Sequence, residues 1–177
     1  ETDNHHYINE RVRKLRNHGS SKRDVHSAGF NSRLDDLHAG ILSAKLKHIK
    51  EWSDRRIEIA HKYSEGLRGC DFLDLPYIRS GYRHVFHLYV IETRNPADRD
   101  KMLDYLVKNG IDAKTHYSIA IHRQDGFPWG KSARLVSPLT NAEKNASSCI
   151  SLPMFPELTE EEIQYTIKAV CDWPKNR

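Results

Sequence analysis

The sequence predicts an α/β protein in which helices come first and short strands alternating with helices follow. Two observations support this order. Apolar residues recur at helical spacing up to Gly69, and a run rich in β-formers, HVFHLYVIET at 84–93, comes soon afterwards. A chain of 177 residues can bury roughly 70% of its unfolded surface, so one core is expected.

The first helix is predicted over residues 5–17. Its single apolar side is formed at helical spacing by Ile8, Val12 and Leu15. Gly19 marks its end, and a polar loop is expected at 20–23.

Residues 25–42 predict a short loop that opens into an amphipathic helix. Gly29 and Phe30 precede Asn31 in the loop, and Ser32 and Asp35 are spaced as a capping pair. The apolar side of the helix is Leu34, Leu37, Ile41 and Leu42. The free amides at such a helix start favour a nearby anion by about 0.3 to 1 kcal/mol. Capping alone also explains these residue types, so a purely structural role stays open.

The helical pattern continues through Ile49, Trp52, Ile59, Tyr63 and Leu67. This span is long for one globular helix, so we expect a break near residues 47–52.

The run at 84–93 predicts a strand whose two sides differ. Alternation places His87 and Tyr89 on one side with Val85 and Ile91, and Phe86 on the other.

The remaining elements follow in order: a helix opened by Asn95 and Pro96 and ended at 109–110, a strand at 111–117, a long loop at 118–139, a short helix capped by Thr140 and Glu143, a short strand at 149–152, and a last helix capped by Thr159 and Glu162.

Composition indicates an ordinary globular protein, with 38% hydrophobic residues, 29% charged residues and a net charge of +4. No apolar run approaches the roughly 20 residues that a membrane helix needs, and the first residues contain no apolar signal core. We therefore expect a cytoplasmic protein with no membrane partner. The basic run RVRKLR lies along one exposed helix side and does not by itself indicate nucleic-acid binding.

The cysteines and histidines predict no metal site. Cys70, Cys149 and Cys171 are too few and too widely spaced for a disulfide scaffold or a CxxC metal site, and an odd count fits reduced thiols. His84 and His87 diverge on a strand. Hydrolase and phosphate-loop motifs are absent from the sequence as well.

The segment THYSIAIHRQ, residues 115–124, holds the remaining candidate side chains. A strand end delivers His116 and Tyr117, and the loop returns His122 and Gln124, so these groups can meet at one opening. Imidazole, phenol and amide groups suit a hydroxyl-rich ligand. A strand-edge His116 and a solvated His122 form the alternative.

Six motifs, in this order and spacing, resemble the DegT/StrS family of sugar aminotransferases: LRNHG at 15–19, GFNSRLDDLHAGIL at 29–42, RR...A..Y...L at 55–67, HLYVI at 87–91, NGI.....HY....H.Q at 109–124 and ISLPMFPELTEEEI at 150–163. The resemblance implies the aspartate aminotransferase fold, and within it the carboxyl-terminal part: long helices, then a small, mostly antiparallel sheet with covering helices. It makes residues 1–24 the end of the large cofactor-binding domain and residues 25–177 the small domain with its interdomain helix.

The same resemblance assigns roles to five residues. Asn31 would reach the cofactor phosphate of the neighbouring subunit, and Arg33 would hold the sugar nucleotide or the cofactor. His116, Tyr117 and His122 would line the substrate entrance. Relatives carry prolines in that entrance loop where this chain has Ser118 and Ala120. His87 also matches a family histidine, without a role that can be separated from strand packing.

The implied enzyme is a homodimer that uses pyridoxal 5'-phosphate (PLP) to transfer an amino group, usually from glutamate, to a nucleotide-linked keto-sugar. Such enzymes serve cell-surface polysaccharide or secondary-metabolite biosynthesis. The resemblance begins after the lysine that forms the Schiff base, so this chain holds no catalytic residue of that kind and is expected to be inactive alone. A PLP-dependent sugar dehydratase of the same fold and a non-catalytic interaction module are the alternatives.

Overall fold

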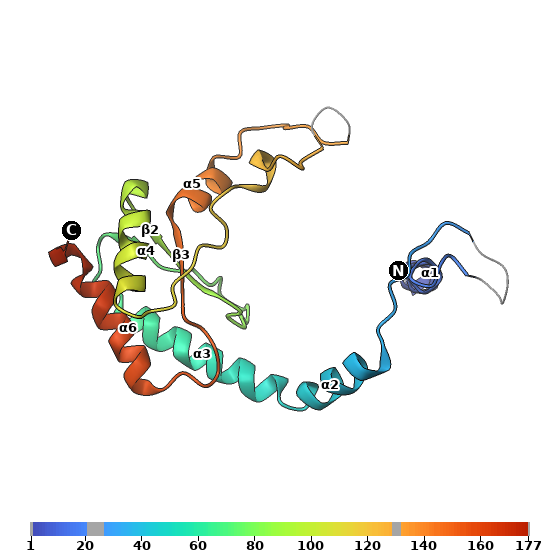
Figure 1. Ribbon diagram of the computed structural model, residues 1–177, viewed down its shortest axis with the longest axis horizontal. Helices are drawn as coiled ribbons and strands as arrows, with labels where there is room; N and C mark the ends of the chain where they lie inside the picture. The colour runs from blue at the N-terminus through green and yellow to red at the C-terminus, as the bar shows by residue number, and fades with distance from the viewer. Residues whose placement is uncertain (1, 21–26, 129–131, 177) are drawn as a thin grey trace. The chain divides into compact units, whose positions relative to one another are not determined.

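The computed structural model describes residues 2–20, 27–128 and 132–176, and its contacts divide the chain into two units, residues 1–49 and 50–177 (Figure 1). Each unit is described here by itself. Most of the polar loop predicted at 20–23, and the predicted domain boundary between residues 24 and 25, lie outside the described residues.

The described residues of the first unit form two helices, α1 (Thr2–Leu15) and α2 (Asp36–Leu46). The predicted first helix is confirmed, although it ends at Leu15 rather than at residue 17. After it, the backbone reverses at Gly19, whose φ of 68° is left-handed and favours glycine. An isolated antiparallel bridge then pairs Asn17 with Asn31.

The start of α2 differs from the prediction. Asp35, not Ser32, is the cap: its carboxylate accepts the His38 N–H at 2.9 Å, and that contact lowers the pKa of Asp35. The Ser32 N–H donates instead to the Arg16 carbonyl at 2.9 Å, in the strand-like pairing before the helix. The predicted apolar side of α2 is fully described, and it is exposed throughout.

In the second unit, α3 (Ile49–Gly66) begins after the expected break, which is a turn at Lys47 and His48. A three-stranded antiparallel sheet follows, in the order β1 (Leu73–Asp74), β2 (Tyr89–Thr93) and β3 (Cys149–Leu152). The central pairing sets Tyr89 opposite Leu152 and Ile91 opposite Ile150.

In the part of this unit that the structure describes, three more helices and three short 3-10 turns follow (Figure 1): η1 (Pro96–Asp98), α4 (Arg99–Lys108), η2 (Ile121–Arg123), α5 (Thr140–Ser148), α6 (Glu160–Asp172) and η3 (Trp173–Asn176). The core lies between the sheet and helices α3, α4 and α6, and its fully buried large side chains include Tyr63, Tyr89, Met102, Ile163 and Trp173. The capping box predicted for the last helix is confirmed, with Thr159 and Glu162 each accepting the other's backbone N–H.

The strand predicted at 84–93 begins only at Tyr89. Phe86 has a φ of 48°, and its N–H donates to His84 Nδ1 at 2.9 Å, so the backbone turns there instead of extending. His87 is exposed and lies outside the strand, whereas Tyr89 is buried within it. The prediction that these two side chains point to one side is therefore wrong.

Two further element predictions are corrected. The strand expected at 111–117 is reduced to one bridge, between Lys114 and Ser151. Thr140 is the first residue of α5 rather than its cap, a position taken by Leu139 without a side-chain hydrogen bond. The Glu143 carboxylate is used elsewhere, as described below.

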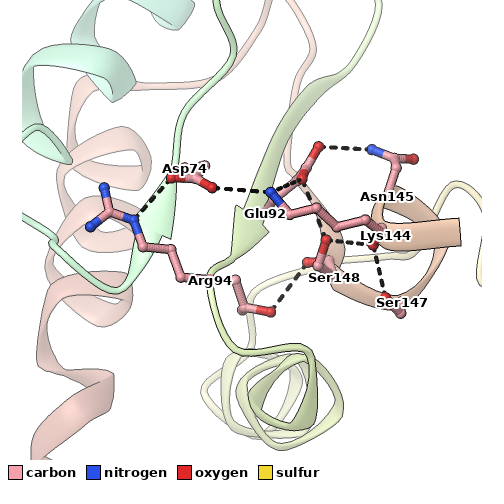
Figure 2. Close-up of polar contacts among 8 residues, drawn as sticks. Asp74, Glu92, Arg94, Lys144, Asn145, Ser147 and Ser148 are labelled. Carbon is pink, nitrogen blue, oxygen red and sulfur yellow. Dashed lines mark hydrogen bonds and ion pairs between the residues drawn. The ribbon is translucent and has the colours of Figure 1, made fainter. Parts of the chain in front are cut away.

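A polar cluster joins β1, β2 and α5 (Figure 2). Glu92 accepts the Asn145 amide at 3.0 Å and lies 3.6 Å from Lys144 Nζ. Lys144 also forms an ion pair with Asp74, and the Asp74 carboxylate accepts a hydrogen bond from Arg94 Nε at 2.9 Å. These contacts fix α5 against the sheet, and α5 in turn forms one wall of the hollow described next.

Candidate cofactor and substrate sites

The first candidate site lies in the first unit, where Asn31 and Arg33 are two residues apart in the sequence and are both exposed. Arg33 Nε donates to Asn31 Oδ1 at 3.2 Å, and Arg33 Nη1 lies 3.5 Å from Asn17 Oδ1. Both amide oxygens therefore face the guanidinium, which leaves the amide NH2 groups of Asn17 and Asn31 as further donors around it.

The backbone beneath these side chains is closely packed. The His18 N–H donates to the Phe30 carbonyl at 2.9 Å, and the Phe30 N–H donates to the Leu15 carbonyl at 2.7 Å. A Cβ on Gly29 would lie 2.0 Å from the Gly19 nitrogen, so only glycine allows the two segments to approach. This explains why the sequence places glycine immediately before the Phe30–Asn31 pair.

The second candidate site is an open hollow of about 380 Å³ in the second unit. Three of the predicted substrate residues, His116, Tyr117 and His122, lie together on its wall. Gln124, also expected at this opening, is not among the lining residues, and its amide donates to the Ile119 carbonyl at 3.3 Å. The rest of the wall is mainly apolar: Ile119, Ala120, Ile121, Phe127, Leu139, Ala142, Asn145 and Ala146.

His116 and Tyr117 are held differently. The Nδ1 of His116 lies 2.9 Å from Ser151 Oγ, which ties the partly buried ring to β3. Tyr117 packs edge-on against that ring, with 5.6 Å between ring centroids, yet its side chain remains 73% exposed. Tyr117 is therefore the most exposed of the three predicted substrate residues on this wall.

His122 is only 5% exposed, and its Nε2 lies 3.0 Å from Glu143 Oε1. The same carboxylate accepts Arg123 Nε at 2.9 Å and Nη2 at 2.6 Å. These contacts, with His122 first and Arg123 second, lower the pKa of Glu143. Because an ionised carboxylate only accepts hydrogen bonds, the Nε2 of His122 carries a proton in this contact.

The sequence profile of the DegT/DnrJ/EryC1/StrS aminotransferase family matches residues 2–171. This chain belongs to that family. The resemblance drawn from the six motifs is therefore confirmed.

Individual family members resemble the chain closely. A UDP-N-acetyl-3-dehydro-alpha-D-glucosamine 3-aminotransferase of Acidithiobacillus ferrooxidans is 40% identical over 157 residues, which are 88% of this chain and 40% of that protein. A pleiotropic regulatory protein of Geobacillus stearothermophilus is 36% identical over 167 residues, covering 93% of this chain and 44% of that protein. The chain thus spans less than half the length of these relatives.

The fold agrees as well. The crystal structure of S. venezuelae DesV in complex with a ketimine intermediate superimposes on this chain with a TM-score of 0.84 and 34% identity. The match covers 94% of this chain and 44% of the DesV chain. The predicted fold class, an α/β small domain with a mostly antiparallel sheet, is confirmed for this family member.

Within the described ranges, no helix is both long and apolar enough to cross a membrane. The part of the chain that the structure describes also contains no group of three or more His, Cys, Asp or Glu side chains arranged to hold a metal ion.

Sequence reasoning does not identify the side chain that holds His122 on the wall of the hollow. Glu143 was interpreted as a helix cap, because it stands three residues after Thr140. The Glu143 carboxylate instead contacts His122, which is 21 residues away in η2. Neither periodicity nor local spacing identifies a pairing between a loop and a helix at that separation.

Proposed function

We propose that this chain is the carboxyl-terminal part of a PLP-dependent aminotransferase that transfers an amino group from glutamate to a nucleotide-linked keto-sugar. The family match over residues 2–171 carries the proposal, and the aminotransferase among the relatives supports the substrate class. The proposed enzyme is a homodimer, in which Asn31 and Arg33 serve the neighbouring subunit.

The side chains of Asn31 and Arg33 fit the phosphate of PLP. A phosphate is best bound by several convergent N–H donors, and a guanidinium supplies them in a planar fork. Arg33 is exposed, is oriented by Asn31 and Asn17, and rests on a backbone that is pinned by its own hydrogen bonds. In the proposed dimer, Asn31 binds the phosphate through its amide and Arg33 holds it through the guanidinium.

When bound, PLP supplies the electron sink that transamination requires. The residues of this chain bind and orient the reactants. His116, Tyr117 and His122 present polar groups on a mainly apolar wall, an arrangement typical of pockets that orient a ligand through a few hydrogen bonds. Through the proton on Nε2, His122 is held in one orientation by Glu143.

We also infer that the 177-residue chain alone does not catalyse transamination. The family resemblance assigns the lysine that bonds to PLP, and moves the proton, to sequence outside this chain. In this proposal, activity requires both this chain and the cofactor-binding portion that carries the lysine.

The test uses the whole polypeptide, this chain preceded by the cofactor-binding portion that the family resemblance calls for, loaded with PLP. It is mixed with glutamate and a panel of UDP- and dTDP-linked 3-keto and 4-keto sugars, and 2-oxoglutarate is measured with coupled glutamate dehydrogenase. Glutamate alone can release one equivalent of 2-oxoglutarate per PLP, so the proposal is supported by 2-oxoglutarate in excess of the enzyme that forms only when a keto-sugar is present; the 177-residue chain is the negative control. Loss of water from the sugar without consumption of glutamate would instead establish the dehydratase.

A non-catalytic role has one specific observation in its favour, the regulatory name of the 36% identical relative from G. stearothermophilus. A non-catalytic role predicts that the whole polypeptide does not convert keto-sugar and glutamate into products. No 2-oxoglutarate with any sugar of the panel, from protein that retains PLP, would favour this second candidate over the aminotransferase.

A further inference from the structure

Two cysteines that are far apart in the sequence lie side by side in the second unit. Cys70 follows the end of α3, and its N–H donates to the Leu67 carbonyl at 3.0 Å. Cys171 is in the last turn of α6. Their sulfur atoms are 2.8 Å apart, whereas a disulfide bond measures about 2.05 Å. Both thiols are free, and only a small movement of either side chain separates them from bonding distance.

The two helices around this pair are already in contact. A Cβ added at Gly66, the last residue of α3, would lie 2.7 Å from the Ile167 side chain of α6. Phe72 and Trp173, which flank the two cysteines in the sequence, also pack together, with ring centroids 5.7 Å apart. The packing on both sides therefore holds Cys70 and Cys171 near one another.

Cys171 is the more accessible cysteine of the pair, and Cys70 borders an open hollow. Cys171 is partly exposed, with its sulfur 3.8 Å from the Gly66 carbonyl oxygen. Cys70 is 9% exposed, yet it lines an open hollow of about 390 Å³ together with Arg68, Asp71 and Arg94. Cys149, the third cysteine, is completely buried in β3 and near Tyr117.

We propose that Cys70 and Cys171 form a reversible disulfide that links the end of α3 to the end of α6. The oxidant is a low-molecular-weight disulfide, RSSR. Cys171, the more exposed thiol, loses its proton and attacks RSSR, so that the S–S bond of RSSR breaks and one RSH leaves. The Cys70 sulfur then loses its proton and attacks Cys171, which displaces the second RSH. Two cysteine sulfurs are oxidised and one RSSR is reduced to two RSH.

Burial of Cys70, followed by the neighbouring Cys171 and Asp71, raises the pKa of Cys70 to about 12. Its thiol is therefore protonated at neutral pH and protected from adventitious attack. Because the thiolate is the nucleophile, closure of the disulfide is expected to become faster as pH rises from 7 to 9.

The experiment uses the full 177-residue chain, reduced and then incubated with oxidised glutathione at pH 8. Thiols titrated after denaturation are expected to fall from three to one, and peptide mapping is expected to identify a Cys70–Cys171 link. The link closes a loop of about 100 residues, so the thermal unfolding midpoint is expected to rise by roughly 5 to 15 °C and to return on reduction.

Matched variants separate the alternatives. Cys149→Ala is expected to form the same link, whereas Cys171→Ser and Cys70→Ala each form none. Glutathione left on Cys171 with Cys70 still a thiol, a link that includes Cys149, or three unchanged thiols would each overturn the proposal. None of these readouts requires transaminase activity, so their outcome is independent of the proposed function.

Discussion

The Nε2 of His122 lies 3.0 Å from the Glu143 carboxylate, although one residue is in the turn η2 and the other is in α5. His122 is almost fully buried, so this contact and the backbone of η2 set the direction of its ring on the wall of the hollow. Glu143 is thus a positioning residue, which acts on a ligand through His122.

Replacing Glu143 with Ala in the whole enzyme is expected to raise KM for the nucleotide sugar about 10-fold, because a charge-assisted hydrogen bond to a buried ring is lost. The value of kcat is expected to change less, and Glu143→Gln is expected to restore most of the affinity because its amide oxygen still accepts the His122 proton. Steady-state kinetics measure both. Arg123→Gln removes the other partner of the carboxylate and is the control. An equal rise in KM for this variant would assign the effect to charge rather than to His122.

Replacing Asn31 with Ala is expected to weaken PLP retention by the whole enzyme roughly 10-fold, because one phosphate donor is lost and Arg33 loses its orienting partner. Equilibrium dialysis followed by cofactor absorbance measures the loss. Ser32→Ala, at the adjacent exposed position, is the matched control and is expected to retain PLP. Identical retention by the Asn31 and Ser32 variants would remove the phosphate role from Asn31.

Acid is expected to weaken one ion-pair network on α3. Arg55 and Lys62 lie 2.7 Å and 2.9 Å from the Glu58 carboxylate and lower its pKa from 4.5 to about 2. Because the pKa is lower in the folded state, the stabilisation is complete above pH 4.5 and is lost as pH falls towards 2. The Glu58 side chain is 53% exposed, so salt screens the effect.

Urea unfolding midpoints of the wild type and of Glu58→Gln, measured at several pH values, test this. The midpoint of the wild type minus that of Glu58→Gln is expected to be small and positive at pH 6. This difference is expected to shrink below pH 4.5 and also in 1 M NaCl. Glu65→Gln, on the same helix, corrects for the loss of one negative charge. A difference that grows as pH falls would contradict the assigned pKa direction.

Two glycines on helices are expected to respond to alanine in opposite ways. At Gly66 the new methyl would overlap Ile167, and overpacking of this kind costs about 1 to 3 kcal/mol. At Gly40, within α2, a Cβ meets nothing within 4 Å, so alanine is expected to stabilise the helix by up to about 1 kcal/mol. Urea unfolding of Gly66→Ala and circular dichroism of Gly40→Ala measure these effects. Equal stability of Gly66→Ala and the wild type would mean that Ile167 moves aside freely.

The sequence was most informative where structure depends on neighbours along the chain. The Thr159 capping box and the break at Lys47 follow from local rules, and the structure confirms both. The strand start failed because the hydrogen bond from Phe86 to the His84 ring turns a segment whose residue types favour extension. The apolar residues of α2 predict a buried side, yet they are exposed, because a pattern of residue types does not report what covers it.

In the candidate sites, the sequence correctly brought His116, Tyr117 and His122 to one opening. It could not find the Glu143 contact, nor the approach of Cys70 to Cys171, because both pairs meet only through tertiary packing. The cysteines illustrate this: Cys70 and Cys171 share no local motif in the sequence, yet their sulfur atoms are 2.8 Å apart.

The short sheet has a consequence for how the chain can associate. Its outer strand β1 is two residues long and is followed closely by Pro76, which has no N–H to offer. On the opposite side, β3 is already paired once, through Ser151 with Lys114. Neither edge presents a long row of free backbone groups to a neighbouring molecule, and such rows are what template β-aggregation. Self-association of this protein is therefore expected to proceed through side-chain surfaces rather than through extension of its sheet.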